Sequence, residues 1–221
     1  MNTTNTAIST IIHIPASLKL VGVIGSLWAL FTIIGASIAY SSLNPNFSPF
    51  TTYLSDIGDT TGWPQIIFNS GTLIGVPICY LVLVLLVLRL SQLGAGRNFA
   101  IATLTIGFLS TLGTALLTAT PFSVSPIVHK TGIVLYFFGV VILQATIFIK
   151  EWAMKDLPGI LPFSCAALVV IFLIFFCLMV LYSQGIVSRS VPTIWEWLSI
   201  FSSIVWMLIQ SLILGKSEIT K

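Results

Sequence analysis

The chain alternates between long runs without any charged residue and short patches in which the charges gather. Each of the six charge-free runs holds at least one stretch close to the roughly 20 apolar residues that a helix needs to cross about 30 Å of hydrocarbon. The pattern predicts membrane-spanning helices near Leu18–Tyr40, Gln65–Leu90, Asn98–Ala119, Pro126–Ile149, Gly159–Tyr182 and Thr193–Leu214. Strands are disfavoured, because the runs lack the period-two alternation of a membrane barrel.

Composition supports this interpretation. Charged residues make up 7% of the 221 residues, against about 25% in an average globular domain. We expect an all-α polytopic integral membrane protein, in which residues 1–221 form a single membrane domain, a six-transmembrane-helix bundle. Glycines inside the spans, such as Gly113 and Gly132, suit close contacts between helices.

The positions of lysine and arginine predict which end of the bundle faces the cytoplasm. Only Lys130 and Arg189 lie on the side of the loops 41–64, 120–125 and 183–192. The other seven of the nine basic residues lie on the opposite side: Lys19, Arg89, Arg97, Lys150, Lys155, Lys216 and Lys221. Because cytoplasmic loops are enriched in basic residues, we expect both the N and C termini in the cytoplasm.

Three classes of function are disfavoured. The net charge of +3 comes from short loops without a basic stripe and interleaved aromatic residues, so no nucleic-acid partner is expected. Cys79, Cys165 and Cys177 fall inside spans with no metal-ligand spacing, so neither a metal nor a cofactor is predicted. A proton- or ion-coupled transporter usually needs a charged residue near the centre of a span, and the predicted spans have none there.

The ionisable residues near the predicted outer face form a short set. They are Asp56, Asp59, His129, Lys130, Arg189 and Glu196. Three carboxylates, an imidazole and two cations at one level of a small bundle can form a polar site facing the outer leaflet. Each member also has a purely structural explanation.

Asp56 lies in the first outer loop, where Ser48-Pro49 has the form of an N-cap followed by the first helical residue. This predicts a short helix that ends at Gly58. Asp56 and Asp59 flank that glycine, and aspartates in such turns commonly cap backbone amides. Capping and a ligand or catalytic role are the two alternatives for Asp56.

His129 and Glu196 have the same two interpretations. His129 lies about one turn into the fourth span, either as a neutral imidazole bonded to a backbone carbonyl or as a general base or ligand. Thr193-Ile194-Trp195-Glu196 has the T-x-x-E form of a capping box, which alone can account for Glu196. Interhelical hydrogen bonding can account for Asn69, and an aromatic belt for Trp195.

Several short motifs occur in a fixed order on the six spans. They are Tyr53-Leu54-Ser55-Asp56-Ile57-Gly58, Phe68-Asn69-x-Gly71, Gly107-x-x-Ser110-x-x-Gly113, His129-x-x-Gly132 with Gln144, and Glu196-Trp197. This order resembles the six-span, DRAM-like family of the damage-regulated autophagy modulators, which also contains a lipid-remodelling factor for GPI anchors. Uncharacterised prokaryotic six-span proteins with an L-S-D-x-G loop are similar too. The very short cytoplasmic loops differ from the eukaryotic modulators and argue against a sorting or kinase-partner role.

The resemblance implies an association with membrane lipids, and its motifs single out Asp56, Asn69, His129 and Glu196. We therefore hypothesise an outer-leaflet polar site that binds or remodels a lipid headgroup. Its candidate catalytic residues are Asp56, His129 and Glu196, and its candidate ligand contacts are Asn69, Lys130, Arg189 and Trp195. No G-x-S-x-G nucleophile motif is present, so the sequence does not decide whether the protein is an enzyme. The alternative is a non-catalytic accessory or structural subunit that packs against a protein partner within the membrane.

Overall fold

The computed structural model describes residues 13–217, which form helices joined by short connections, without a strand. Six of these helices are long and apolar enough to cross a membrane: α2 (Ile14–Leu43), α4 (Trp63–Gln92), α5 (Arg97–Ala119), α6 (Pro126–Ala153), α7 (Ile160–Ser183) and α8 (Ser190–Leu214). A short helix, α3 (Leu54–Asp59), lies in the connection between α2 and α4. The prediction of an all-helical, six-span integral membrane protein is confirmed.

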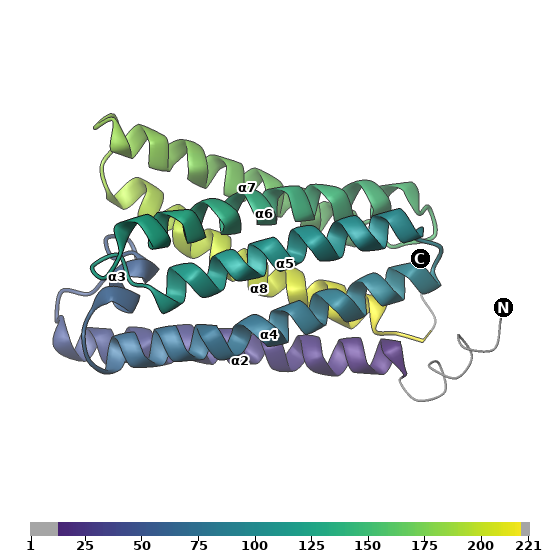
Figure 1. Ribbon diagram of the computed structural model, residues 1–221, viewed down its shortest axis with the longest axis horizontal. Helices are drawn as coiled ribbons and strands as arrows, with labels where there is room; N and C mark the ends of the chain where they lie inside the picture. The colour runs from purple at the N-terminus through teal and green to yellow at the C-terminus, as the bar shows by residue number, and fades with distance from the viewer. Residues whose placement is uncertain (1–12, 218–221) are drawn as a thin grey trace.

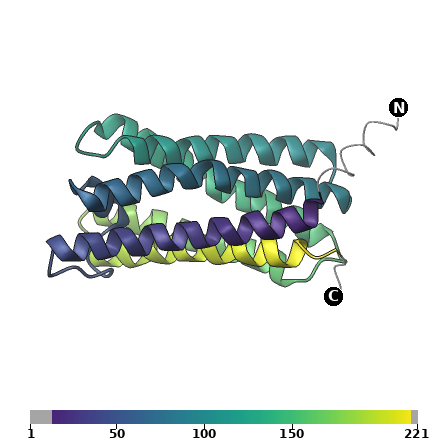
Figure 2. The same ribbon diagram turned by 90° about the horizontal axis from the view of Figure 1, so that it is seen from below.

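The six long helices form a closed ring. Each packs against the next along the chain, and α8 returns to pack against α2. Figure 1 shows α3 at one end of the bundle, which we call the α3 end. The start of α2 and the end of α8 lie together at the other end, which we call the terminal end (Figure 2). That the terminal end faces the cytoplasm stays a prediction.

The helices extend beyond the predicted apolar runs by up to four residues. Helix α6 continues past Ile149 to Ala153, and α8 begins at Ser190 rather than Thr193. A helix satisfies its own backbone and can therefore continue into polar sequence once an apolar stretch has established it. Because of these extra turns, Glu151 lies in the buried interior of the bundle, although the predicted span had ended before it.

Two apolar clusters fill the ring. The larger lies among α2, α4, α6, α7 and α8 and includes Leu86, Leu90, Ile147 and Leu161. The smaller seats α3 against its neighbours and consists of Ile33, Ala36, Leu54, Ile57 and Trp197. Burial of a leucine or isoleucine side chain contributes about 1.5–3 kcal/mol, so Leu54 and Ile57 anchor α3 firmly.

Helices α5 and α6 approach most closely where two glycines face each other. A Cβ atom on Gly113 would lie 2.5 Å from the backbone nitrogen of Tyr136, and one on Gly132 would lie 2.6 Å from that of Leu117. Both distances are far below van der Waals contact, so the two backbones touch through these glycines.

Candidate functional site

Helix α3 begins later than the sequence predicted. The expected start at Ser48 is wrong, because its carbonyl accepts hydrogen bonds from the backbone of Thr51 and Thr52 and closes a turn instead. Tyr53 is then extended, with φ −67° and ψ 152°, and the helix starts at Leu54 and passes through Gly58 to Asp59. A separate turn therefore precedes α3, and the helix is not continuous with that turn.

Asp56 caps this helix. Its Oδ2 accepts a hydrogen bond from the backbone N–H of Tyr53 at 2.9 Å and also pairs with the guanidinium of Arg189. The two side chains are 34% and 48% exposed, so the ion pair contributes at most about 1 kcal/mol. The capping interpretation of Asp56 agrees with these contacts.

Glu196 also binds the start of α3, and the capping-box interpretation of this residue is wrong. Helix α8 already begins at Ser190, and the hydroxyl of Thr193 donates to the Arg189 carbonyl at 2.8 Å. The carboxylate of Glu196 instead reaches across to α3 and accepts a hydrogen bond from the backbone N–H of Leu54 at 2.7 Å. Asp56 and Glu196 therefore bond two successive amides at one helix N-terminus, where negative charge is favourable.

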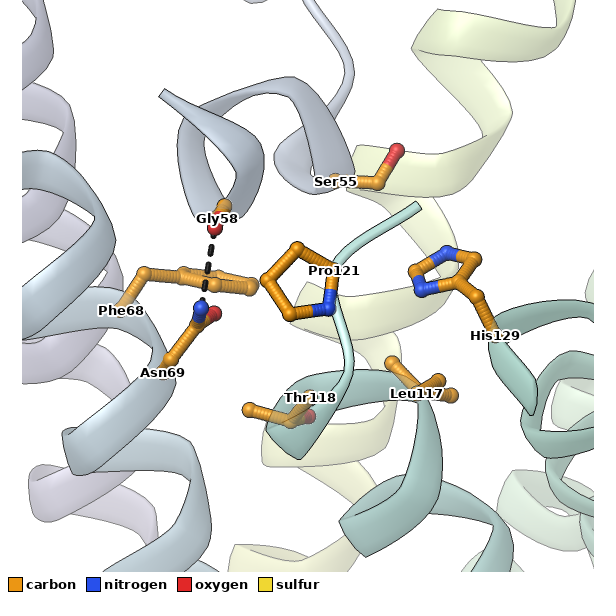
Figure 3. A pocket seen from close by; sticks show the side chains of 8 residues that line it. All are labelled: Ser55, Gly58, Phe68, Asn69, Leu117, Thr118, Pro121 and His129. Carbon is orange, nitrogen blue, oxygen red and sulfur yellow. Dashed lines mark hydrogen bonds between the residues drawn. The ribbon is translucent and has the colours of Figure 1, made fainter. Parts of the chain in front are cut away.

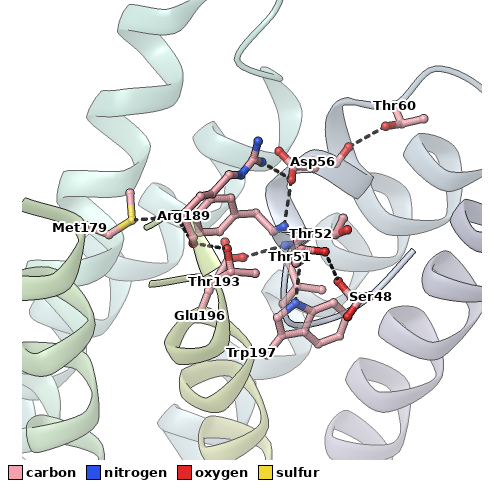
Figure 4. Close-up of polar contacts among 12 residues, drawn as sticks. Ser48, Thr51, Thr52, Asp56, Thr60, Met179, Arg189, Thr193, Glu196 and Trp197 are labelled. Carbon is pink, nitrogen blue, oxygen red and sulfur yellow. Dashed lines mark hydrogen bonds and ion pairs between the residues drawn. The ribbon is translucent and has the colours of Figure 1, made fainter. Parts of the chain in front are cut away.

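Tyr53 and Arg189 complete this network, which Figure 4 shows around the first turn of α3. The Arg189 guanidinium lies 4.9 Å from the centre of the Tyr53 ring, and the Tyr53 hydroxyl donates to the Arg189 carbonyl at 3.4 Å. Burial raises the pKa of the Tyr53 hydroxyl above its ordinary value, so this group stays a hydrogen-bond donor well beyond neutral pH.

A small pocket lies beside α3. Residues from α3, α4, α5 and the start of α6 line it: Ser55, Gly58, Phe68, Asn69, Leu117, Thr118, Pro121 and His129. Its empty volume is about 240 Å³, but this figure includes open solvent at the mouth, and the enclosed part has room for about one water molecule. The pocket can therefore enclose a group of about the size of a hydroxyl, but neither a whole headgroup nor a lipid.

His129 and Asn69 lie on opposite sides of this pocket, with Pro121 between them in Figure 3. The Nδ1 atom of His129 lies 3.0 Å from the Thr120 carbonyl oxygen. A carbonyl only accepts, so Nδ1 holds a proton, and in the neutral form of the ring Nε2 is left as an acceptor. The amide of Asn69 donates to the Gly58 carbonyl at 2.9 Å, which ties α4 to α3.

The remaining candidate contacts lie farther out. Lys130 is exposed beside His129, with its ammonium group 5.8 Å from the centre of the Phe122 ring. Trp195 is partly exposed on α8, next to Glu196. Arg189, which the sequence analysis offered as a ligand contact, is already paired with Asp56.

The structure thus divides the candidate residues into two groups that share α3. Asp56, Arg189 and Glu196 surround its first turn, whereas Asn69 and His129 line the pocket on its other side.

The lining residues Ser55, Thr118 and Pro121 were missed by the sequence analysis. Ser55 could have been found, because it precedes Asp56 in the L-S-D-x-G motif. Thr118 and Pro121 have no such signal.

The two carboxylates beside α3 are already engaged in hydrogen bonds. Both carboxylates are engaged by backbone amides, and Asp56 is also held by Arg189, so neither is poised as a base. The His129 Nε2 can accept a hydrogen bond from a ligand. Thr118, 2% exposed, has a hydroxyl with no partner among residues 13–217. Within those residues no three histidine, cysteine or carboxylate side chains are grouped to hold a metal ion.

Comparison with known proteins gives a family. The model of the Frag1/DRAM/Sfk1/Cwh43P N-terminal domain matches residues 17–213, a segment that includes every candidate site residue. No curated protein and no solved structure matches the chain.

Proposed function

The chain belongs to the Frag1/DRAM/Sfk1/Cwh43P N-terminal domain family, and from this premise we propose that it binds a phospholipid headgroup at the α3 end of its bundle. It is an integral multi-pass membrane protein, so its long helices are surrounded by lipid. The α3 end lies where these helices leave the hydrocarbon, at the level of the headgroups. The pocket at that level has a mostly apolar lining with a few polar side chains, and it is within reach of a headgroup.

The observation on which the proposal depends is the pocket between α3 and the start of α6. It brings together the Ser55 hydroxyl, the Asn69 amide and the His129 ring at one opening. A headgroup hydroxyl can donate to His129 Nε2. The enclosed space suits a single hydroxyl of the headgroup, with the rest of the headgroup at the mouth and the acyl chains outside along the apolar helices.

Lys130 supports a phosphate-bearing ligand. It follows His129 directly, is exposed, and has no carboxylate within 4.0 Å among the residues that the structure describes. Arg189 is less suitable because Asp56 balances its charge. In the proposed complex the Lys130 ammonium group contacts the phosphate while the pocket takes a hydroxyl of the headgroup.

The proposal is one of binding, with no reaction assigned. The engaged carboxylates of Asp56 and Glu196 agree equally with an accessory subunit that holds α3 rigid for a protein partner. The two functions differ in what the purified protein retains. A bound phospholipid supports the headgroup proposal, whereas a stoichiometric protein partner without lipid supports the accessory subunit.

Exchanging Lys130 for glutamine is expected to weaken phospholipid binding roughly fivefold, since one exposed charge contact contributes about 1 kcal/mol. The matched control is Lys150→Gln, which removes the same charge from the terminal end of the same helix and should leave binding unchanged. Affinity is measured by native mass spectrometry of the detergent-purified protein titrated with short-chain phosphatidylglycerol. Equal effects of the two substitutions would refute the site.

A further inference from the structure

A carboxylic acid side chain is buried inside the bundle near its terminal end. Glu151 of α6 is 1% exposed and lies among α6, α7 and α8. Its neighbours Cys165 and Gln210 are each 0% exposed. This group is far from the pocket at α3, and nothing in the proposed headgroup site uses it.

Only neutral donors face the carboxylate. Its Oε2 accepts from the Gln210 amide at 3.3 Å and from the Cys165 thiol at 3.5 Å. The Trp206 N–H on α8 points to the Cys165 sulfur at 3.2 Å. No cation lies within 4.0 Å of Glu151 among residues 13–217.

The nearby charged side chains are engaged elsewhere. Lys150, next to Glu151 on α6, reaches towards the Gly94 carbonyl at 3.5 Å. Arg89 on α4 donates to the carbonyls of Leu214 and Lys216 at the end of α8, at 3.0 and 2.9 Å. Lys155 and Asp156 are exposed in the connection to α7. The buried carboxylate therefore has no opposite charge to offset its desolvation, which costs several kcal/mol for an ionised group.

The cluster also has more acceptors than donors. Glu151 Oε1 and Gln210 Oε1 are both buried, and neither has a hydrogen-bond donor within the described part of the chain. The Gln210 amide nitrogen, by contrast, faces four acceptors at 3.3–3.5 Å: Glu151 Oε2, the Leu161 carbonyl, Ser164 Oγ and Cys165 Sγ. A single added proton removes the charge and supplies the missing donor.

We propose that Glu151 and Gln210 form a proton-binding site inside the bundle, in which Glu151 is a neutral carboxylic acid at neutral pH. The hydroxyl at its Oε1 donates to Gln210 Oε1, while the Gln210 amide donates back to Oε2. The carboxylic acid of Glu151 on α6 and the amide of Gln210 on α8 then satisfy each other's hydrogen-bonding groups. Release of the proton leaves a charge that three packed helices cannot compensate, so their packing loosens at alkaline pH.

Labelling with dicyclohexylcarbodiimide tests this site directly in the wild-type chain. This apolar reagent adds a protonated carboxylic acid across a C=N bond, the acid proton moves to nitrogen, and the adduct rearranges to a stable N-acylurea. Ordinary exposed carboxylates are protonated about one part in a thousand at neutral pH. We therefore expect modification of Glu151 to exceed that of exposed Asp156 by on the order of a hundredfold, measured by peptide mass spectrometry.

The labelling should disappear in Glu151→Gln, and in the wild type it should fall as the pH is raised. Absence of Glu151 modification at neutral pH, in a protein whose Glu151 is modified at pH 5, would overturn the proposal, because the labelling at pH 5 shows that the reagent reaches the buried side chain. Protection of Glu151 by sodium chloride but not by choline chloride would also overturn it, because the occupant would then be a sodium ion. Neither result bears on the headgroup site, which lies at the other end.

Discussion

Substitution of Gly113 by alanine is expected to destabilise the protein by about 1–3 kcal/mol, because the new methyl group meets backbone rather than a movable side chain. The added Cβ would lie 2.5 Å from the Tyr136 nitrogen and 2.8 Å from the Gly132 carbonyl oxygen. Helices α5 and α6, which share the most extensive contact between any two of the described helices, must then move apart. Thermal unfolding in mild detergent, followed by size-exclusion chromatography, measures the loss.

The matched control is Gly35→Ala in α2. A Cβ there would meet the Ile67 side chain at 3.6 Å, which is ordinary contact. Alanine is better than glycine in a helix by about 1 kcal/mol, so this variant should be as stable as the wild type or more stable. If Gly113→Ala unfolds at the same temperature as Gly35→Ala, the close approach of α5 and α6 is incorrect.

Removing the carboxylate of Glu196 is the second change with a large expected effect. Glu196→Ala leaves the backbone N–H of Leu54 without its acceptor, which costs about 1–3 kcal/mol for a buried group. Helix α3 has only six residues and cannot form alone. We expect it to detach, taking the Ser55 and Gly58 walls of the pocket with it. Hydrogen exchange of residues 48–60 should accelerate, and phospholipid binding should fall with it.

Glu196→Gln is the matched control for this change. It keeps one acceptor oxygen on a side chain of nearly the same shape, so exchange in α3 should accelerate less than in Glu196→Ala. Asp56→Asn should have a smaller effect still, because the Asp56 side chain is partly exposed. Fast exchange throughout the bundle in Glu196→Ala would mean that the carboxylate supports the whole fold and not α3 in particular.

The six spans could be predicted because each depends on a local property, the length of an apolar run. The hydrogen-bond partner of Glu196 could not be predicted. Glu196 on α8 accepts a hydrogen bond from the backbone of Leu54, 142 residues earlier in the chain, whereas the local T-x-x-E pattern suggested a nearer partner. The start of α3 was misplaced for a related reason. Ser48-Pro49 resembles a helix start, but the Ser48 carbonyl closes a turn, and apolar contacts of Leu54 and Ile57 decide where the helix lies.

Glu151 shows a further limit of the sequence pattern. Lys150 and Glu151 follow an apolar run, which assigns them to a loop, yet α6 continues through both. The helix period then places Gln144, Ile147 and Glu151 on the same buried face. Charge alone could not reveal this burial, because it depends on where α7 and α8 pack.

The central claim, that a phospholipid headgroup binds at the α3 end, is tested most directly by photo-crosslinking. A phosphatidylglycerol analogue with a diazirine in its headgroup is reconstituted with the wild-type protein and irradiated, and the modified residues are mapped by mass spectrometry. We predict adducts concentrated on the residues that line the pocket, Ser55, Asn69 and His129, and on Lys130 beside it. Adducts spread equally over both ends, or confined to the terminal end around Lys19 and Lys150, would contradict the account.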